Sequence, residues 1–594
     1  MHANGCEMIL DRFCKRSAGC CRFLPLALMA LLVTAGEARA ATPNNHPFCK
    51  ALATGKLHAS SGAEMWCFGP QPNGPNPTLD LRTFAQPLVV GFASNNVDAA
   101  SLSEDITPSG GRAAGQAETS IAAAGPYVVE GWNDSTGFFS PCPSPDNKEE
   151  LSGFGFSSNG GKSFTDLGGP PNAKCATWLY EGDPSVEAYQ VGGSTYFYYS
   201  SIYANVTGTS YNAIALTACQ VLPGPTATLS CSEPVIAGAS TQCLSSPPFK
   251  FCSFLDKEFM TIDKVRGRLY ISYTEFGVTS SHSPDGQIEL AACDIGNALG
   301  GPGPIGGTPA APVCENGSAA SATKPPRPYF IVAPGDNVNF CEREGAYPAA
   351  DPEKGDVYVA HEYNWGTDEF GACESVPHVE EVDYAPSSCL TLPTASCSGP
   401  AATTSIPIVS TDLTEIPGYN RGIGNDFPRI AVSDAHGTVS VVWNDERSNP
   451  QADILLQSLD LVTLSPVQSA PVKLNNDAHI GTLHFLPGLR NVDANGNLNV
   501  SWYDRRRNPN SGLTDVFAAL DVNPRTTSTP TSNTRVTNVA TDWLSVGSII
   551  VPNFGDYTDN FIDLLPGGGS TMYAAWSDGR YNIPQPFCAH EGVK

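Results

Sequence analysis

The sequence predicts an all-β fold: a β-propeller of four-stranded blades, with seven blades favoured over six. Three observations lead to this prediction. A strand-like segment recurs seven times, its copies stand ~74 residues apart on average, and glycine and proline are abundant. The chain has 594 residues, of which 57 are glycine and 50 are proline, so turns are frequent and long helices are disfavoured.

The recurring segment is a strand with one apolar face. Alternate positions are apolar and the last of them is a large ring, a period of two that indicates packing against a core. The five clearest copies are GRLYISYTE (267–275), GDVYVAHEY (355–363), GTVSVVWND (437–445), GNLNVSWYD (496–504) and STMYAAWSD (570–578). Two looser copies are YVVEGWND (127–134) and TYFYYSS (195–201).

The ring that ends each copy serves as an anchor for counting blades. A unit of ~74 residues holds four short strands and their turns, whereas sandwiches lack so long a repeat and β-helix coils are far shorter. Seven anchors favour seven blades; six would follow if one of the two looser copies were an inserted hairpin. The anchors are Trp132, Tyr199, Tyr273, His361, Trp443, Trp502 and Trp576.

A short polar segment precedes each anchor by roughly 14 to 20 residues and opens another strand. If that strand is the innermost one of each blade, the polar segments ring the mouth of the central channel. Six of the seven carry an acid and one carries His484. The acids are Glu118, Asp183, Asp256, Glu344, Asp426 and Asp556.

The segments outside the repeat are assigned as follows. Residues 1–40 are expected to be a secretory signal peptide, because a basic region precedes the apolar run 23–36 and Ala38-Arg39-Ala40 gives a cleavage pattern after Ala40. That run is too short to span a bilayer. Residues 41–111 form a non-repeat segment in which Leu81 to Gly91 is a candidate closing strand, and residues 112–594 form the propeller. The glycine-rich stretch 296–313 is expected to be a loop between the third and fourth repeats.

Cysteines indicate an oxidising compartment. The sequence has 19 cysteines, and those that remain after residue 40 are odd in number, so at least one thiol is free or intermolecular. Disulfides are favoured over zinc, because no CxxC pair occurs and no histidine lies at ligand spacing from these cysteines. The close spacings that suggest stapled loops are Cys219/Cys231, Cys243/Cys252 and Cys389/Cys397, and a further tied segment is expected around Cys49 and Cys67.

Composition and charge exclude several classes of protein. Hydrophobic residues make up 41% of the chain and charged residues 15%, which suits a large core and excludes a disordered chain. The net charge of −26 would repel a polyanion, so nucleic acid is not an expected partner. Beyond residue 40 no apolar run approaches the ~18 residues of a membrane helix.

One short motif resembles a known superfamily. The stretch SSNGGKSF (157–164) matches the Asp-box S-x-[DN]-x-G-x-x-[WF] at Ser157, Asn159, Gly161 and Phe164. This box recurs in sialidase-like, BNR-repeat propellers, where it forms a turn between the outer strands of a blade. Three W-x-D-x-R runs also resemble that superfamily: Trp443-Asp445-Arg447, Trp502-Asp504-Arg506 and Trp576-Asp578-Arg580. The family's Phe/Tyr-Arg-Ile-Pro motif is missing, and Pro428-Arg429-Ile430 is only a fragment of it.

The resemblance implies a glycan or glycoconjugate as partner, at the channel mouth. Inner-strand carboxylates with raised pKa values would suit glycoside hydrolysis, or hard oxygen ligands could bind calcium; no cofactor is required by the sequence. The W-x-D-x-R pairs recur in three blades and are therefore interpreted as structural braces. The catalytic candidates are Glu344, Asp426, Asp556 and Tyr557, and the candidates for gripping an acidic sugar are Arg343, Arg429 and Arg490.

Three functions remain open from the sequence. The first is a secreted exo-glycosidase of sialidase type that removes a terminal acidic sugar. The second is a glycan-binding propeller without turnover, and the third is a scaffold for protein partners. Three arginines converging on one pocket would favour the first, and arginines scattered outward beside an aromatic platform would favour the second.

Overall fold

The computed structural model describes fourteen ranges of the chain, all within the second of its two compact units, Met1–Thr42 and Pro43–Lys594. The expected signal peptide (1–40) and the candidate closing strand (81–91) lie outside the described residues. The described ranges are 46–54, 59–69, 92–102, 115–138, 150–205, 211–246, 249–277, 286–315, 328–336, 341–364, 378–406, 416–421, 424–478 and 481–594.

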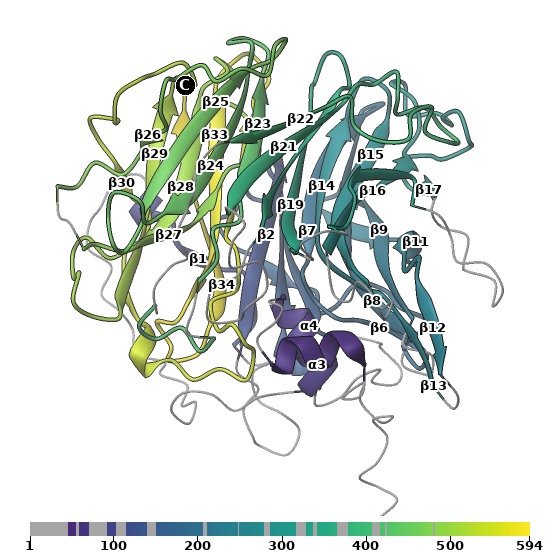
Figure 1. Cartoon of the computed structure of the whole chain (residues 1–594), viewed down its shortest axis with the longest axis horizontal. Helices are drawn as coiled ribbons and strands as arrows, with labels where there is room; N and C mark the ends of the chain where they lie inside the picture. The colour runs from purple at the N-terminus through teal and green to yellow at the C-terminus, as the bar shows by residue number, and fades with distance from the viewer. Residues whose placement is uncertain are drawn as a thin grey trace, which may run out of the picture. The chain divides into compact units, whose positions relative to one another are not determined.

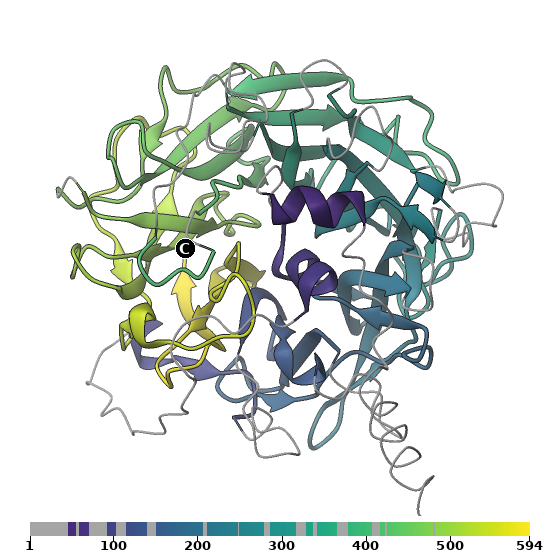
Figure 2. The same cartoon turned by 60° about the horizontal axis from the view of Figure 1, so that its bottom comes forward.

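Seven antiparallel sheets form the blades of a propeller around a central axis (Figure 1 and Figure 2). The fold class is therefore the predicted one, with seven blades. Blade 1 consists of β2 (Gln116–Ala124), β3 (Tyr127–Asp134), β4 (Ser152–Ser157) and β5 (Thr165–Asp166). Blade 2 consists of β7 (Ser185–Val191), β8 (Ser194–Asn205), β9 (Asn212–Leu222) and β10 (Thr228–Cys231), with β6 (Trp178–Tyr180) beside β8 and β11 (Val235–Ala239) beside β9.

The remaining blades repeat this order from the axis outward, after a hairpin of β12 (Cys243–Ser246) and β13 (Phe249–Cys252). Blade 3 has β14 (Phe254–Asp263), β15 (Arg268–Phe276), β16 (Gly286–Asp294) and β17 (Val313–Cys314), with β18 (Phe330–Ala333) beside β16. Blade 4 has β19 (Arg343–Ala350), β20 (Val357–Tyr363), β21 (Val379–Ala385) and β22 (Ala402–Ile406). Blade 5 has β23 (Arg429–Ser433), β24 (Thr438–Asp445), β25 (Asp453–Asp460) and β26 (Val472–Lys473). Blade 6 has β27 (His484–Gly488), β28 (Leu498–Asp504), β29 (Leu513–Val522) and β30 (Thr534–Arg535), with β31 (Thr541–Asp542) beside β29.

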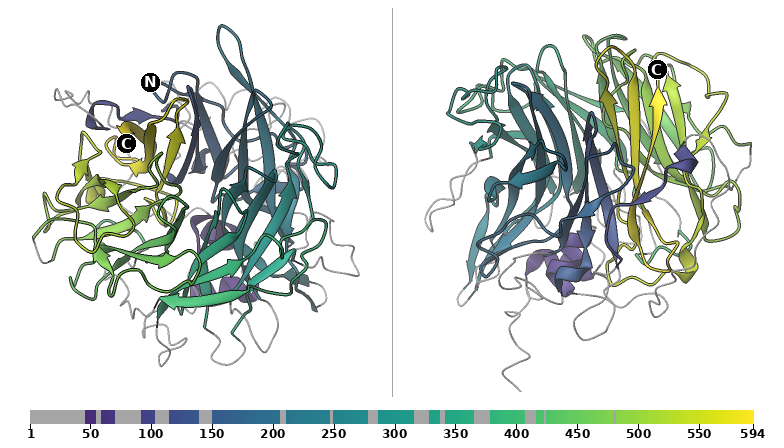
Figure 3. Two further views of the ribbon diagram at one scale, coloured as in Figure 1. Left: turned by 90° about the horizontal axis from the view of Figure 1, so that it is seen from above. Right: turned by 180° about the vertical axis from the view of Figure 1, so that it is seen from behind.

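Blade 7 closes the ring with strands from both ends of the propeller. It combines β32 (Asp559–Leu564), β33 (Ser570–Asp578) and β34 (Gln585–Val593) with β1 (Val97–Asp98) at its outer edge. Val97 pairs with Cys588 and Asp98 with Phe587. Figure 3 shows β1 beside the yellow C-terminal strands. The segment before the first repeat thus supplies a closing strand at Val97–Asp98; the candidate stretch 81–91 lies outside the described residues.

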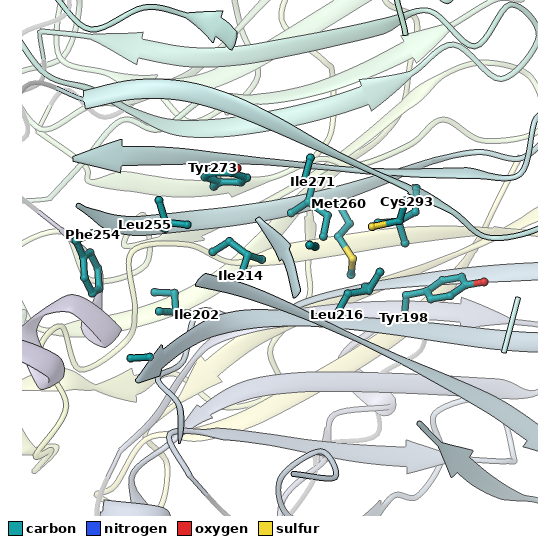
Figure 4. Close-up of a cluster of buried hydrophobic side chains, with 14 of the residues drawn as sticks. Tyr198, Ile202, Ile214, Leu216, Phe254, Leu255, Met260, Ile271, Tyr273 and Cys293 are labelled. Carbon is teal, nitrogen blue, oxygen red and sulfur yellow. The ribbon is translucent and has the colours of Figure 1, made fainter. Parts of the chain in front are cut away.

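Every predicted anchor lies on the second strand of its blade, so the seven copies of the repeated segment correspond to the seven blades. The tryptophans at these positions are completely buried. Neighbouring blades pack face to face; Figure 4 shows the cluster between blades 2 and 3, where Ile214 and Leu216 meet Met260 and Ile271. The stretch 296–313 is a long connection between the third and fourth copies of the repeat, as expected; within the fold it follows β16 in blade 3 and ends at Val313, the first residue of β17.

The W-x-D-x-R runs brace the blades. In each run the indole Nε1 donates to the aspartate Oδ2, at 3.1, 2.8 and 3.0 Å, and the arginine Nε donates to Oδ1 at 2.9 Å. The aspartate thus ties the anchor ring to the turn that follows the strand, as a bidentate Arg–carboxylate pair can. This matches the structural interpretation. The aspartates are Asp445, Asp504 and Asp578.

Disulfides staple the predicted loops. The pairs Cys219–Cys231, Cys243–Cys252 and Cys389–Cys397 are present, as are Cys49–Cys67 and Cys293–Cys314. Cys588 is a free, buried thiol in the described part of the chain. Within that part, no helix has the length and apolar character needed to cross a membrane.

Two short helices before the propeller lie over one end of the channel. They are α3 (Pro47–Ala53) and α4 (Ser61–Phe68), joined by the disulfide Cys49–Cys67, and Figure 2 shows them at the centre of the ring. Residues 46–54 and 59–69 are called the cap below. Three short 3₁₀ helices complete the described elements: η1 (Phe92–Ser94), η2 (Ser135–Phe138) and η3 (Trp543–Ser545).

Candidate functional site

In four of the blades the innermost strand opens with a β-bulge at the channel mouth. The pairing of the first and second strands is interrupted just after Ala117, Asp256, Glu344 and Phe485. A bulge places an extra residue in one strand and re-aims its side chain. Residues in the left-handed region occur at this point in three of these blades and in blade 2: Glu118, Asp183, Lys257 and Leu486, with φ of 56°, 56°, 55° and 50°.

Lys257 is the centre of a buried cluster of charges. Its Nζ lies 2.5 Å from Asp556 Oδ2, 3.5 Å from Asp183 Oδ2 and 3.6 Å from Glu118 Oε1, and these four side chains are at most 1% exposed. They come from blades 1, 2, 3 and 7, so the cluster joins four blades at the axis. We call these four residues the mouth cluster.

Further hydrogen bonds from neighbouring residues hold the mouth cluster in place. Asp556 also accepts from Arg421 Nη1 at 2.5 Å and from Tyr419 at 3.0 Å, and its backbone N–H donates to Glu118 at 3.1 Å. The amide of Asn133 donates both to Glu118 and, at 3.4 Å, to Asp183. The carboxylates are therefore bound to partners from the chain itself.

The carboxyl groups of the mouth cluster have pKa values that are shifted in opposite directions. Burial would raise the pKa of Asp556, but Arg421 and Lys257 outweigh it and hold that pKa below its ordinary value. At Glu118 burial, and after it the charge of Asp183, raise the pKa well above the usual range. Burial would lower the pKa of Lys257, yet the surrounding carboxylates raise it, so the ammonium stays charged.

The cap covers the mouth cluster. The backbone N–H of Ser60 donates to Asp256 Oδ2 at 2.9 Å, and Arg421 donates to the carbonyl of Ala59. A side chain at Gly62 would overlap the carbonyl of Glu181, so the cap lies directly on the blade 2 entry. Phe48 stacks on Phe254, the first residue of blade 3, with centroids 4.6 Å apart.

Two of the three candidate arginines meet deeper in the channel. Arg490 is paired with Asp559 at 2.6 Å and hydrogen bonded to Tyr347 at 3.0 Å. The guanidinium of Arg429 lies 4.8 Å from the rings of both Phe259 and Tyr347. Both arginines are buried, and burial lowers the pKa of Arg429, which has aromatic rings around it and no ion-paired carboxylate among the described residues.

The third arginine is elsewhere. Arg343 stacks over Tyr363 at 4.4 Å, donates to the carbonyl of Pro334 at 2.8 Å and lies 3.6 Å from Glu381. The structure therefore brings Arg429 and Arg490 together around Tyr347 but places Arg343 at a different point of blade 4.

The four catalytic candidates also separate. Asp556 belongs to the mouth cluster. Tyr557, beside it, donates to the Pro184 carbonyl at 3.4 Å, and burial raises the pKa of its phenol well above 10.0. Glu344 and Asp426 lie on blades 4 and 5, where Asp426 is 3.3 Å from His378. Glu362, His378, Glu380 and Asp426 bring their ligand atoms within 4.8 Å of one another, a group that could hold a metal ion.

The residues predicted to form an Asp-box lie in a hydrogen-bonded turn between β4 and β5. The Asn159 side chain accepts from the backbone N–H groups of Lys162 and Ser163, both at 3.1 Å, and Ser157 accepts from Gly161 at 3.0 Å. The side chains thus bond their own loop, on the outer part of blade 1.

A partly exposed aromatic group lies on the rim of blade 2 next to the cap. Trp178 stacks on Tyr203 with centroids 5.1 Å apart and planes at 19°, and Tyr211 meets Trp178 edge-on at 5.7 Å. Asn172 accepts from the Tyr203 hydroxyl at 2.8 Å and donates to the Trp178 carbonyl. Trp178 and Tyr211 keep part of their surface in solvent. We call Trp178, Tyr203 and Tyr211 the rim aromatics.

Sequence reasoning missed Lys257, Arg421 and His378. Lys257 follows Asp256 directly, and only the acid of that pair was counted at the channel entry. The usable signal was the position of the bulge, which puts Lys257 and not Asp256 in the place that Glu118 and Asp183 occupy in their blades.

Comparisons with known proteins give a likeness of fold. No protein-family model matches the chain, and no curated protein matches it. Trypanosoma rangeli sialidase is 8% identical, with 88% of this chain and 59% of that chain covered and a TM-score of 0.29. An N-acetylgalactosamine deacetylase from F. plautii, in complex with blood group B trisaccharide, is 11% identical over 55% of this chain and 85% of that one, with a TM-score of 0.29. The Dos1 propeller is 7% identical over 84% and 95%, with a TM-score of 0.34.

These likenesses carry no argument about activity at such identities and TM-scores. This chain also covers less than two thirds of the length of the Trypanosoma rangeli sialidase chain.

Proposed function

We propose that this protein is a secreted propeller that binds carbohydrate at the mouth-side rim of its channel and does not hydrolyse it. The observation that carries the proposal is the closed mouth. Lys257 and the three carboxylates of the mouth cluster are paired with one another beneath the cap, so these carboxylates are already bound by groups of the chain itself. Buried polar groups that are mutually satisfied rigidify a structure.

The rim aromatics are the binding surface in this proposal. A sugar ring presents an apolar face of C–H groups, and Trp and Tyr offer a flat apolar surface with a polar group beside it. Trp178 is the platform, and the hydrogen-bonded Asn172 and Tyr203 fix its position. The Asp-box resemblance supports carbohydrate as the ligand class.

Secretion is supported by the disulfides and by the expected signal peptide. Disulfides persist in oxidising compartments, and stapled loops recur through the chain. A reduced cytosol would leave these loops untied.

One observation favours a second candidate, an exo-glycosidase whose site lies under the cap. The pKa of Glu118 is raised by burial while that of Asp556 is held low by Arg421 and Lys257, and carboxyl groups with divergent pKa values serve as acid and base in glycoside hydrolysis. In this candidate the cap must leave before substrate enters.

Two measurements test the proposal on the purified full chain. The first is glycan binding on an array of sialylated and neutral glycans; Trp178→Ala should weaken binding at least tenfold. The matched control is Tyr127→Ala, a partly exposed tyrosine at the opposite end of blade 1, which should leave binding unchanged. Equal binding by the Trp178 variant would remove the rim from the proposal.

The second measurement is hydrolysis of a fluorogenic α-sialoside, with and without calcium. We expect no turnover by the native chain or by Gly62→Leu, in which the new side chain overlaps Glu181 and loosens the cap. Turnover by Gly62→Leu that disappears when Glu118→Gln is added would establish the second candidate instead.

A further inference from the structure

The three inner strands of blade 4 carry a row of glutamates. Glu344 on β19 pairs with Glu362 on β20, which pairs with Glu380 on β21. Directly opposite residues share one face of a sheet with Cβ atoms about 5 Å apart, and like charges there are destabilising. All three side chains are buried, at no more than 1% exposed. We call these residues the glutamate row.

The fold does not require acids at these positions. The corresponding row, just before the bulge, is mixed in blade 3 and apolar or aromatic in blade 6. It reads Asp256, Thr274 and Ile288 in blade 3 and Phe485, Tyr503 and Val516 in blade 6. A row of three buried glutamates therefore calls for a reason other than strand pairing.

The glutamate row lacks partners. Within the described ranges, neither oxygen of Glu362 nor of Glu380 has a hydrogen-bond donor, and no lysine or arginine reaches ion-pair distance of either. A buried carboxylate without a counter-charge is strongly unfavourable. Among the described residues, the imidazole Nε2 of His378 lies 3.9 Å from Glu362 Oε2.

The ligand atoms fit the size of a metal ion. The atoms offered by Glu362, His378, Glu380 and Asp426 all lie within 4.8 Å of one another. Two ligands of one ion, each at ~2.0–2.4 Å, can be no more than ~4.8 Å apart. His378 is two residues before Glu380 and so lies on the same side of the chain, while Asp426 comes from the segment that opens blade 5.

We propose that Glu362, Glu380, Asp426 and His378 bind one divalent metal ion of the Zn²⁺ or Mn²⁺ type. Carboxylate oxygens suit hard cations and an imidazole nitrogen favours these metals over Ca²⁺. The ion would supply the counter-charge that the glutamate row lacks. Because Asp426 belongs to blade 5 and the other ligands to blade 4, the ion would also tie the two blades together beside the channel mouth.

The test is metal binding by the full chain after treatment with a chelator. Isothermal titration with Zn²⁺, Mn²⁺ and Ca²⁺ is expected to give one equivalent of Zn²⁺ or Mn²⁺ per chain, bound at least tenfold more tightly than Ca²⁺. The double variant Glu362→Gln/Glu380→Gln should bind at least 100-fold more weakly. The matched control is Glu381→Gln, on the same strand with its side chain beside Arg343, which should stay within threefold of the native affinity.

Unfolding curves in metal-free buffer check that the double variant folds, since removing buried like charges should not destabilise it. Native chain that binds no ion at one equivalent, or a folded double variant that binds as tightly as the native chain, would overturn the proposal. Ca²⁺ binding that His378→Ala leaves unchanged would overturn the assigned ligand set as well.

Discussion

Two buried groups of carboxyls lie near the same end of this channel, and they differ in where their counter-charge comes from. In the mouth cluster, Lys257 and Arg421 reach the carboxylates directly, at 2.5 Å from Asp556 in both cases. In the glutamate row, Glu362 and Glu380 have no lysine or arginine at such a distance in the described part of the chain. Burial raises pKa values in both groups, yet only in the first does the chain reverse the effect at one carboxyl, Asp556.

The difference shows that burial alone does not decide whether the charge of a carboxyl group is balanced by the chain. An ion pair whose members all come from the protein is complete in itself and holds blades 1, 2, 3 and 7 together. The glutamate row has no such cation in the described part of the chain, and in our proposal a bound metal ion supplies the missing positive charge. The predictions below test this contrast, beginning with the largest expected effect.

Removing the central cation should destabilise the molecule most. In Lys257→Met the carboxylates of Asp183 and Asp556 lose a buried partner, and breaking a buried pair costs about 3–5 kcal/mol of unfolding free energy. Chemical denaturation at pH 7 measures the loss. Lys473→Met is the control, because its pair with Asp453 is partly exposed and is expected to contribute about 0–1 kcal/mol. Equal losses in the two variants would contradict a special role for the mouth cluster.

Opening the disulfide of the cap should have the next largest effect. Cys49 and Cys67 are separated by 18 residues, and loop-closure entropy assigns such a bridge about 3 kcal/mol. In Cys49→Ser/Cys67→Ser, hydrogen exchange should quicken in residues 46–69 and not in blade 5. Unchanged exchange in the cap would mean that its packing against Phe254, and not the disulfide, holds it.

Neutralising one acid in each group should change stability in opposite directions. Asp556→Asn weakens contacts with Lys257 and Arg421, so we expect a loss of about 2–3 kcal/mol. Glu362→Gln relieves repulsion in the glutamate row, so in metal-free buffer we expect a gain of about 1 kcal/mol. Unfolding in denaturant with a chelator present compares the two variants. A loss in both would show that the glutamate row is complete without an added ion.

The smallest expected effect is a pH dependence of the free energy of unfolding that comes from Glu64 in the cap. Burial raises the pKa of Glu64 on α4 to about 7, outweighing Arg421, with Asp556 and Asp256 adding to the rise. A raised folded pKa contributes stability that is present below pH ~4.5 and is lost as the pH rises through about 7. Because Glu64 is partly exposed, we expect about 1 kcal/mol. Glu64→Gln should flatten the unfolding free energy between pH 5 and 8, while the exposed control Glu353→Gln should not.

The architecture could be predicted because it repeats. Alternating apolar positions that end in Trp443, Trp502 or Trp576 record one strand per blade, and the number of anchors is the number of blades. Such a strand pattern is determined by residues that are close together in the sequence, so it can be recognised without the structure. The disulfides of short loops, such as Cys389–Cys397, were predictable for the same reason.

The site was less predictable because bulges and long-range pairing decide it. A bulge shifts the side-chain alternation by one residue, so Glu118 and Lys257 reach the mouth from the bulge position whereas Asp256 and Glu344 precede it. Lys257 and Asp556 are 299 residues apart in the sequence, and no local pattern marks that pair. The glutamate row depends on the register of three strands, which the sequence spacing alone does not fix.

The strand that closes blade 7 has a consequence for how the molecule is made. β1 pairs with β34, so the circle is complete only when the last strand has emerged. In a chain that leaves the ribosome or a translocation channel N-terminus first, Val97 and Asp98 stay unpaired while the other blades assemble. Until then the growing arc presents free sheet edges, which invite aggregation. The ring is therefore expected to close only after β34 has emerged, and chaperones that shield open edges would act on the arc and not on the closed ring.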